Sequence, residues 1–215
     1  MARKTAIRKA GTIWATLAPL FLSATHAIAQ PTAKSEAPET KTATRERFSA
    51  TTVNLASGSG EKLRFDLFRW SSDEEREKLV SALKEKGADQ LDTTLQALPE
   101  SGYIWMSDES LGYSVHYAYR QRLHNGGERI IFATDRSLGS WSGHPWTAKT
   151  ESNAVSYPFT VIELILNSSG GGDGKMSLNS KVVFNETDKT IALENSESSP
   201  ALLKNVQRAD GPSKN

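Results

Sequence analysis

Residues 157–167 constrain the fold of this chain more than any other stretch. Apolar side chains occupy both alternating sets of positions, with Phe159, Val161 and Ile165 in one set and Ile162, Leu164 and Leu166 in the other. Successive side chains of a strand point to opposite faces, so this pattern indicates a strand that is covered on both sides. A buried helix is the competing interpretation, but Pro158, the β-branched residues and the glycines at 170–172 favour a strand.

Alternation elsewhere predicts further strands joined by short turns. Leu63, Phe65 and Leu67 alternate with polar residues, which is typical of a strand with one wet face. Tyr113, Val115, Tyr117 and Tyr119 are expected to share one face of a strand over 113–119, and Asn125-Gly126 predicts the hairpin that follows. The other expected strands cover residues 48–55, 103–106, 129–134, 175–185, 190–194 and 201–208. The glycine-rich segment 170–175 is interpreted as a flexible hairpin loop.

Two helices are predicted between the second and third strands. Ser72 followed by Glu75 forms a capping-box pattern, and Gly87 stands where a helix over 72–86 would end. Leu91, Leu95 and Leu98 then repeat at helical spacing over 88–98. Both patterns are amphipathic, so each helix is expected to pack one face on the sheet.

These elements predict a β-rich (α+β) fold: an antiparallel meander of about nine strands that forms a barrel or a sandwich, with the two-helix insertion after the second strand. The sequence does not separate barrel from sandwich. One domain is expected over residues 48–208, preceded by a disordered linker at 30–47 and followed by a disordered tail at 209–215, because both flanks lack apolar residues large enough to offset the entropy of ordering.

Residues 1–29 have the pattern of a signal peptide. Four basic residues precede an apolar segment, and Ala27-Ile28-Ala29 supplies a small-x-small cleavage pattern before Gln30. A membrane anchor is the alternative, but the apolar segment is short and contains Pro19. We therefore expect an exported protein, periplasmic or extracellular, with no membrane span after processing.

Charge and cysteine content narrow the classes of partner. The chain has 26 basic and 25 acidic residues, and removal of the signal peptide leaves 22 against 25, a net charge of about −3. A mildly acidic protein lacks the basic surface that nucleic-acid binding requires. The chain has no cysteine, which excludes disulfides and thiolate metal sites, so the fold is held by burial.

Two segments carry a family resemblance. Residues 69–76 (Arg-Trp-Ser-Ser-Asp-Glu-Glu-Arg) and 157–164 (Tyr-Pro-Phe-Thr-Val-Ile-Glu-Leu) resemble a family of uncharacterised exported bacterial proteins. The similarity covers most of residues 48–208. It implies an export-associated domain and no particular activity, cofactor or site.

Glu163 and the loop before the central strand hold the candidate site residues. A buried carboxylate without a partner is costly, so Glu163 is expected to pair with an arginine such as Arg129 or Arg120, to stay protonated, or to face solvent. Carboxylates with shifted pKa values are also frequent at functional sites. The loop 135–156 contains Trp141, His144 and Trp146, and the two indoles predict either plugs at the end of the core or a ligand-stacking lip.

No motif in the sequence predicts catalysis, a metal or a cofactor. His116, His124 and His144 have no ligand spacing, and ordinary surface or loop positions are expected for them. Ser142, His144 and Asp135 lack the elbow motif of a hydrolase, and the glycine-rich segment lacks a phosphate-loop pattern. We expect a non-enzymatic module that binds an apolar or lipid-like small molecule; a protein–protein interaction module of the cell envelope is the alternative.

Overall fold

The computed structural model describes residues 45–106, 110–140, 146–148, 156–178, 180–194 and 201–209. Eight strands form the main sheet: β1 (Glu46–Val53), β3 (Lys62–Leu67), β4 (Gly102–Met106), β5 (Tyr113–Arg122), β6 (Glu128–Thr134), β8 (Val161–Leu166), β9 (Gly171–Met176) and β12 (Ala201–Ala209). The other strands are β2 (Leu55–Ser57), β7 (Thr147–Ala148), β10 (Val182–Asn185) and β11 (Thr190–Leu193).

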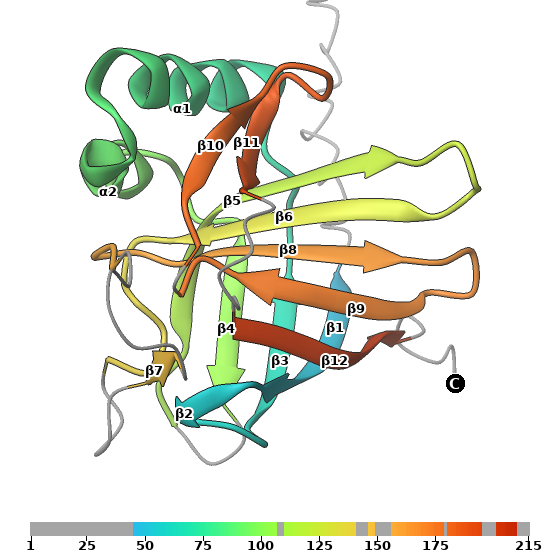
Figure 1. Cartoon of the computed structure of the whole chain (residues 1–215). Coiled ribbons are helices and arrows are strands. Elements are labelled where there is room, and N and C mark those ends of the chain that lie inside the picture. Colours follow the sequence, from blue (N-terminus) through green and yellow to red (C-terminus); the bar gives the residue numbers. More distant parts are fainter. Residues whose placement is uncertain are drawn as a thin grey trace, which may run out of the picture. The chain divides into compact units, whose positions relative to one another are not determined.

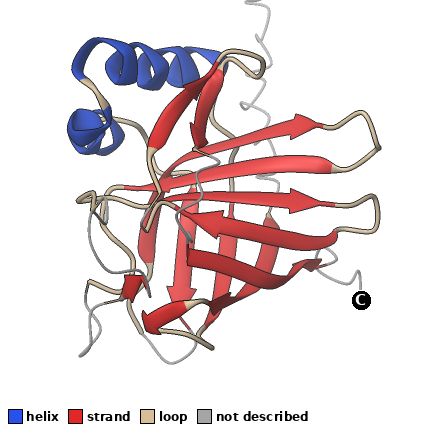
Figure 2. Ribbon diagram, in the orientation of Figure 1, coloured by secondary structure: helices blue, strands red, loops and turns tan. Residues whose placement is uncertain are grey.

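The main sheet closes into an antiparallel barrel (Figures 1 and 2). Each of its strands pairs with the next barrel strand along the chain, and β12 returns to pair with β1, with Phe48 opposite Arg208. Closure leaves every strand of this sheet with two paired neighbours, which removes the exposed edges that an open sheet would present. The predicted β-rich fold is confirmed, and the structure selects the barrel over the sandwich.

Two helices follow the second barrel strand, as the sequence predicts: α1 (Asp73–Lys86) and α2 (Leu91–Gln96), with a short 3₁₀ turn (Ala88–Gln90) between them. The Glu75 backbone N–H donates to Ser72 Oγ at 3.2 Å, and the Ser72 N–H donates to Glu75 Oε2 at 2.8 Å, which completes the capping box. Gly87 ends α1 with φ of +82°, a conformation that glycine adopts without strain. The second helix is shorter than the predicted 88–98.

The helices and the β10–β11 hairpin cover one side of the barrel (Figure 1). Their apolar faces meet the outer faces of β5, β6 and β8 in what we call the outer cluster, which includes Leu79, Leu91, Leu95, Tyr117, Ile131, Val161, Ile191 and Leu193. A separate set of apolar side chains fills the barrel and forms the interior cluster, which includes Phe48, Leu63, Phe65, Ile104, Phe132, Ile162, Leu164 and Leu203.

The central strand β8 lies between these two clusters. Ile162 and Leu164 are buried in the interior cluster, and Val161 is buried in the outer cluster. The predicted strand with two covered faces is therefore confirmed. Cover on the outer face ends before Ile165, whose residue surface is 41% exposed.

The predicted common face of the β5 tyrosines is wrong. A bulge between Val115 and Tyr117 shifts the register with β6. The extra residue reverses the alternation, so Tyr113 and Val115 point into the barrel whereas Tyr117 packs in the outer cluster. The bulge thus lets one strand contribute large side chains to both clusters.

The glycine-rich segment is a barrel strand and not the expected flexible loop. Gly172 and Gly174 pair with Leu166 and Leu164 across β8, and β9 ends at Met176 instead of continuing to residue 185. A Cβ at Gly174 would lie 2.8 Å from the Glu163 backbone oxygen, closer than real Cβ atoms approach. Glycine is therefore required here by close packing within the sheet.

Candidate functional site

The barrel interior is apolar at its centre. The rings of Phe48 and Phe65 flank Phe132 at centroid separations of 5.8 and 5.3 Å, and all three side chains are buried. Ile104, Ile162 and Leu164 complete the surrounding wall. A closed barrel of eight strands has an interior that side chains can fill or that can hold one small ligand. In this barrel, the described apolar side chains occupy the centre of the interior.

Trp146 closes one end of the barrel. Its indole is 7% exposed, belongs to the interior cluster, and lies against the backbone of Gly58 and Gly139. A Cβ at either glycine would overlap the indole, so the ring fits only because both positions lack a side chain. The expected core plug is therefore confirmed for Trp146, and a ligand-stacking role stays a prediction. Trp141 and His144 lie outside the described residues.

The opposite end of the barrel carries charged side chains. Glu46 Oε1 accepts a hydrogen bond from Trp70 Nε1 at 3.0 Å and lies 3.4 Å from Arg120 Nη1. Arg208 Nη2 pairs with Glu128 Oε2, and its guanidinium lies 5.3 Å from the centre of the Phe48 ring. The two ends of the interior therefore differ in chemistry: one is closed by an indole and the other by ion pairs.

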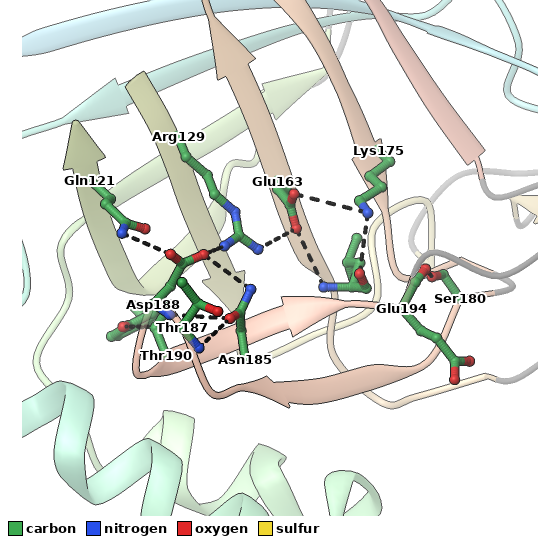
Figure 3. A network of polar contacts seen from close by, with 12 residues as sticks. Gln121, Arg129, Glu163, Lys175, Ser180, Asn185, Thr187, Asp188, Thr190 and Glu194 are labelled. Carbon is green, nitrogen blue, oxygen red and sulfur yellow. Dashed lines mark hydrogen bonds and ion pairs between the residues drawn. The ribbon is translucent and has the colours of Figure 1, made fainter. Parts of the chain in front are cut away.

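Glu163 lies on the outer face of β8, beneath the β10–β11 hairpin (Figure 3). Arg129 Nη2 donates to Glu163 Oε2 at 2.9 Å, and Lys175 Nζ lies 3.9 Å from Oε1. The backbone N–H of Leu193 in β11 reaches the same Oε2 at 3.4 Å. The predicted pairing of Glu163 with an arginine is confirmed, and the partner is Arg129.

Asp188 connects this ion pair to the hairpin turn. Its carboxylate accepts hydrogen bonds from Arg129 Nη1, from Gln121 Nε2 at 2.8 Å and from Asn185 Nδ2 at 3.0 Å (Figure 3). Two cations and two carboxylates thus neutralise each other across β6, β8, β9 and the turn. Such a set orients the hairpin on the barrel, because breaking one pair would leave an uncompensated buried charge.

The structure does not bring Glu163 and Trp146 together. Trp146 packs inside the barrel, whereas Glu163 lies outside it, between the inward-pointing Ile162 and Leu164. The barrel wall separates the two positions. A single site that contains both side chains is therefore not formed by the described residues.

His116 occupies a buried position at the β5 bulge, and the expected surface position is wrong for this histidine. Its Nδ1 lies 2.7 Å from the Leu98 carbonyl oxygen, which accepts, so Nδ1 carries a proton. Its Nε2 lies 3.8 Å from Asp135 Oδ2. Over the described ranges, no three His, Asp or Glu side chains are grouped closely enough to hold a metal ion.

The charged end was missed in the sequence analysis. Glu46 is the first residue of β1 and Arg208 is the second-last residue of β12, positions where charged residues usually reach solvent. Alternation along β1 places Glu46 on the same face as Phe48. This shared face was the feature of the sequence that could have indicated that Glu46 points into the barrel. The face shared by Glu46 and Phe48 is an inner face only if the sheet closes into a barrel, and the sequence does not determine whether it closes.

Comparison with protein-family models, with curated proteins and with solved structures gave no match. The resemblance to uncharacterised exported proteins therefore stays a prediction. None of the helices in the described ranges has the length and apolar character to cross a membrane.

Proposed function

We propose that this protein is a non-enzymatic binding module that holds one apolar or lipid-like small molecule within its barrel. The observation that carries the proposal is an apolar barrel interior, centred on Phe48, Phe65 and Phe132, with one end closed by the single indole of Trp146. Burial of an apolar ligand is favourable by about 25 cal/mol per Å² of surface removed from water.

Trp146 is positioned to act as a removable plug. It lies just before β7, a strand that pairs with β2 and not with the barrel strands. Outward movement of the indole would therefore break no hydrogen bond of the barrel sheet. Ligand entry then requires a transient loss of the contacts of one side chain with Gly58, Gly139 and the interior cluster, and the indole closes again over the bound molecule as an aromatic anchor.

The proposed site comprises the interior cluster and the loop that carries Trp141, His144 and Trp146. Aromatic side chains supply a large contact area at a small cost in conformational entropy. Glu163 faces the other side of the barrel wall and is not part of this proposal. We place the module outside the cytoplasm because of the predicted signal peptide.

Titration with N-phenyl-1-naphthylamine, a neutral apolar fluorophore, tests the proposal. The full chain should be purified from the exported fraction, where its N-terminal sequence is expected to begin at Gln30. Binding should saturate at one fluorophore per chain, and Trp146→Ala should weaken it by about tenfold, as expected for loss of an aromatic anchor. Trp146→Leu provides a milder variant if the alanine variant does not fold.

Trp105→Ala is the matched control. Trp105 lies on the outer face of β4, between the inward-pointing Ile104 and Met106, and the Arg64 guanidinium is 5.3 Å from its ring centre. Its removal should leave fluorophore binding unchanged. Absence of saturable binding to the wild-type chain would refute the proposal, and equal loss in both variants would show that the fluorophore does not enter the barrel.

An interaction module is the second candidate, and one surface favours it. Phe68, Tyr103 and Trp105 form an aromatic row outside the barrel, with successive ring centres 6.1 Å apart. Leu111, which is 64% exposed, precedes Gly112, the glycine over which the Trp105 ring packs. An exposed leucine beside half-buried aromatic rings is the kind of apolar surface that occurs at protein interfaces. Retention of an envelope protein by the wild type but not by Trp105→Ala, without fluorophore binding, would favour this candidate.

A further inference from the structure

Charged side chains at the end opposite Trp146 point into the barrel. The pairing of residues between neighbouring strands shows this in four places. Directly opposed residues of neighbouring strands share a face of the sheet. Each charged residue is opposed by a member of the interior cluster, in the pairs Glu46–Leu67, Arg208–Phe48, Arg120–Ile130 and Glu128–Leu166. The inner face of the barrel thus changes from apolar to ionic within one alternation along these strands.

Among the residues that the structure describes, the charges at this end do not cancel. Arg122 is opposite Glu128 and therefore lies on the same face as Arg120, farther along the β5–β6 hairpin. Arg120, Arg122 and Arg208 provide three positive charges, whereas Glu46 and Glu128 provide two negative ones, a balance of one positive charge. This end therefore favours a ligand group that carries negative charge.

Arg208 has an unused donor at this position. Its Nε–H is buried and donates to no acceptor among the described residues; the nearest ion-pair partner is Glu46 Oε2 at 3.7 Å, which is too far for a hydrogen bond. Its Nη2 remains paired with Glu128. A guanidinium has five N–H donors, so Arg208 can bind a second anion without releasing the first.

We propose that the ligand is an amphipathic anion, such as a long-chain carboxylate, whose acidic head accepts a hydrogen bond from Arg208. Its apolar body would lie along Phe48 and Phe132 toward Trp146. The position of the Arg208 guanidinium 5.3 Å from the Phe48 ring centre places the donor directly beside the apolar interior. This inference rests on the proposed function, because it names the ligand class of the same interior site.

Comparison of cis-parinaric acid with its methyl ester tests the inference, since the two fluorescent probes differ only in the charged head. The wild-type chain should bind the acid about tenfold more tightly than the ester, a difference that corresponds to about 1.4 kcal/mol. The double variant Arg208→Met with Glu128→Gln removes the donor without leaving Glu128 as an unpaired charge. In this variant, the two probes should bind with affinities within about threefold of each other.

Two further variants make the result specific to Arg208. Lys204→Met removes a charge from the same strand β12, where Lys204 Nζ pairs with Asp173 Oδ2 at 2.7 Å on the exposed surface. It should retain the preference for the acid. Arg208→Lys keeps the charge but lacks the Nε–H donor, and it should lose part of the preference even if the double variant does not fold.

The outcomes separate this inference from the proposed function. Equal binding of acid and ester by the wild type would overturn the anionic head while leaving the apolar site in place. A preference that persists in both Arg208 variants would also overturn it. Binding of neither probe would refute the proposed function and this inference together.

Discussion

The interior cluster and the outer cluster are both buried, but they are held by different means. The interior cluster is enclosed by a continuous ring of paired strands, and its centre is a contact among three phenylalanine rings. The outer cluster is covered by elements outside the barrel: the two helices and the β10–β11 hairpin. Its cover is oriented by the buried ion pairs of Arg129 with Glu163 and Asp188.

This difference shows how the same barrel strands can support two separate apolar clusters, one on each face. Strands β5, β6 and β8 contribute side chains to both clusters. The centre of the barrel needs no charged group to fix its structure, because closure gives the backbone N–H and C=O groups of every strand partners in the sheet. The outer layer needs specific polar contacts, because a hairpin on an apolar face could otherwise slide. The interior should therefore govern global stability, and the ion pairs should govern the order of the cover.

The largest expected effect comes from breaking the interior. Phe132→Ala removes a ring that is 1% exposed and in contact with two others. We expect the free energy of unfolding to fall by about 3–5 kcal/mol, a large part of the roughly 5–15 kcal/mol of a typical domain. Chemical denaturation measures it. Ile165→Ala, on the exposed face of β8, should lower the free energy of unfolding by less than about 1 kcal/mol. Equal losses of stability in the two variants would mean that the contact among the interior rings does not dominate the stability of the barrel.

Breaking the outer layer should have a smaller and more local effect. Arg129→Met leaves Glu163 and Asp188 without their shared guanidinium. We expect a loss of about 3 kcal/mol. Hydrogen exchange should show reduced protection of β10, β11 and α1 first, with the barrel strands protected to higher free energy. Lys189→Met, which breaks an exposed pair with Glu186, should cost less than about 1 kcal/mol. Uniform loss of protection would contradict the two-layer interpretation.

The smallest expected effect is a dependence of stability on alkaline pH that arises mainly in the outer layer. Burial raises the pKa of the Tyr117 hydroxyl, which forms a 2.8 Å hydrogen bond with Thr190 Oγ1 in β11. The contribution of Tyr117 to the free energy of unfolding is therefore fully present below about pH 10 and falls as the pH rises, because the hydroxyl ionises more readily in the unfolded chain than in the folded chain. The slope is at most about 1.4 kcal/mol per pH unit for one group.

Tyr117→Phe should remove most of this alkaline slope in denaturation midpoints measured between pH 9 and 11. A smaller slope should persist, because burial also raises the pKa of Tyr157 in the same cluster, and the hydrogen bond with Glu100 raises the pKa of Tyr103 on β4. An unchanged slope in the variant would assign the titration to groups other than Tyr117.

Local elements were the most predictable part of the fold. The capping box at Ser72 and Glu75 is satisfied by residues three positions apart, so the sequence contains the whole interaction. The same holds for the alternation of β3 and for the two-sided pattern of β8. Glu163 could be identified as a carboxylate that needs a partner if it is buried, and Arg129 and Arg120 could be named as candidates from the neighbouring strands that were expected.

Other features depend on contacts between distant residues. The bulge before Tyr117 is defined by the pairing of β5 with β6, and a one-residue shift sends each following side chain to the other face. The β9 strand contains glycines that indicate a loop locally, yet its neighbours β8 and β12 supply partners on both sides. No pattern within the segment contains that information.

The sequence by itself determined the β-rich class and the placement of the helical insertion, because these follow from alternation and capping. For Glu163 it left three states open, paired, protonated or facing solvent, because a buried charge is costly only where it has no partner. Only the tertiary structure decided that the sheet closes, that Trp146 lies between two glycines, and that Arg208 points toward Phe48. The inner and outer faces of a strand become distinct when the first and last strands pair, and β1 and β12 are separated by almost the whole domain.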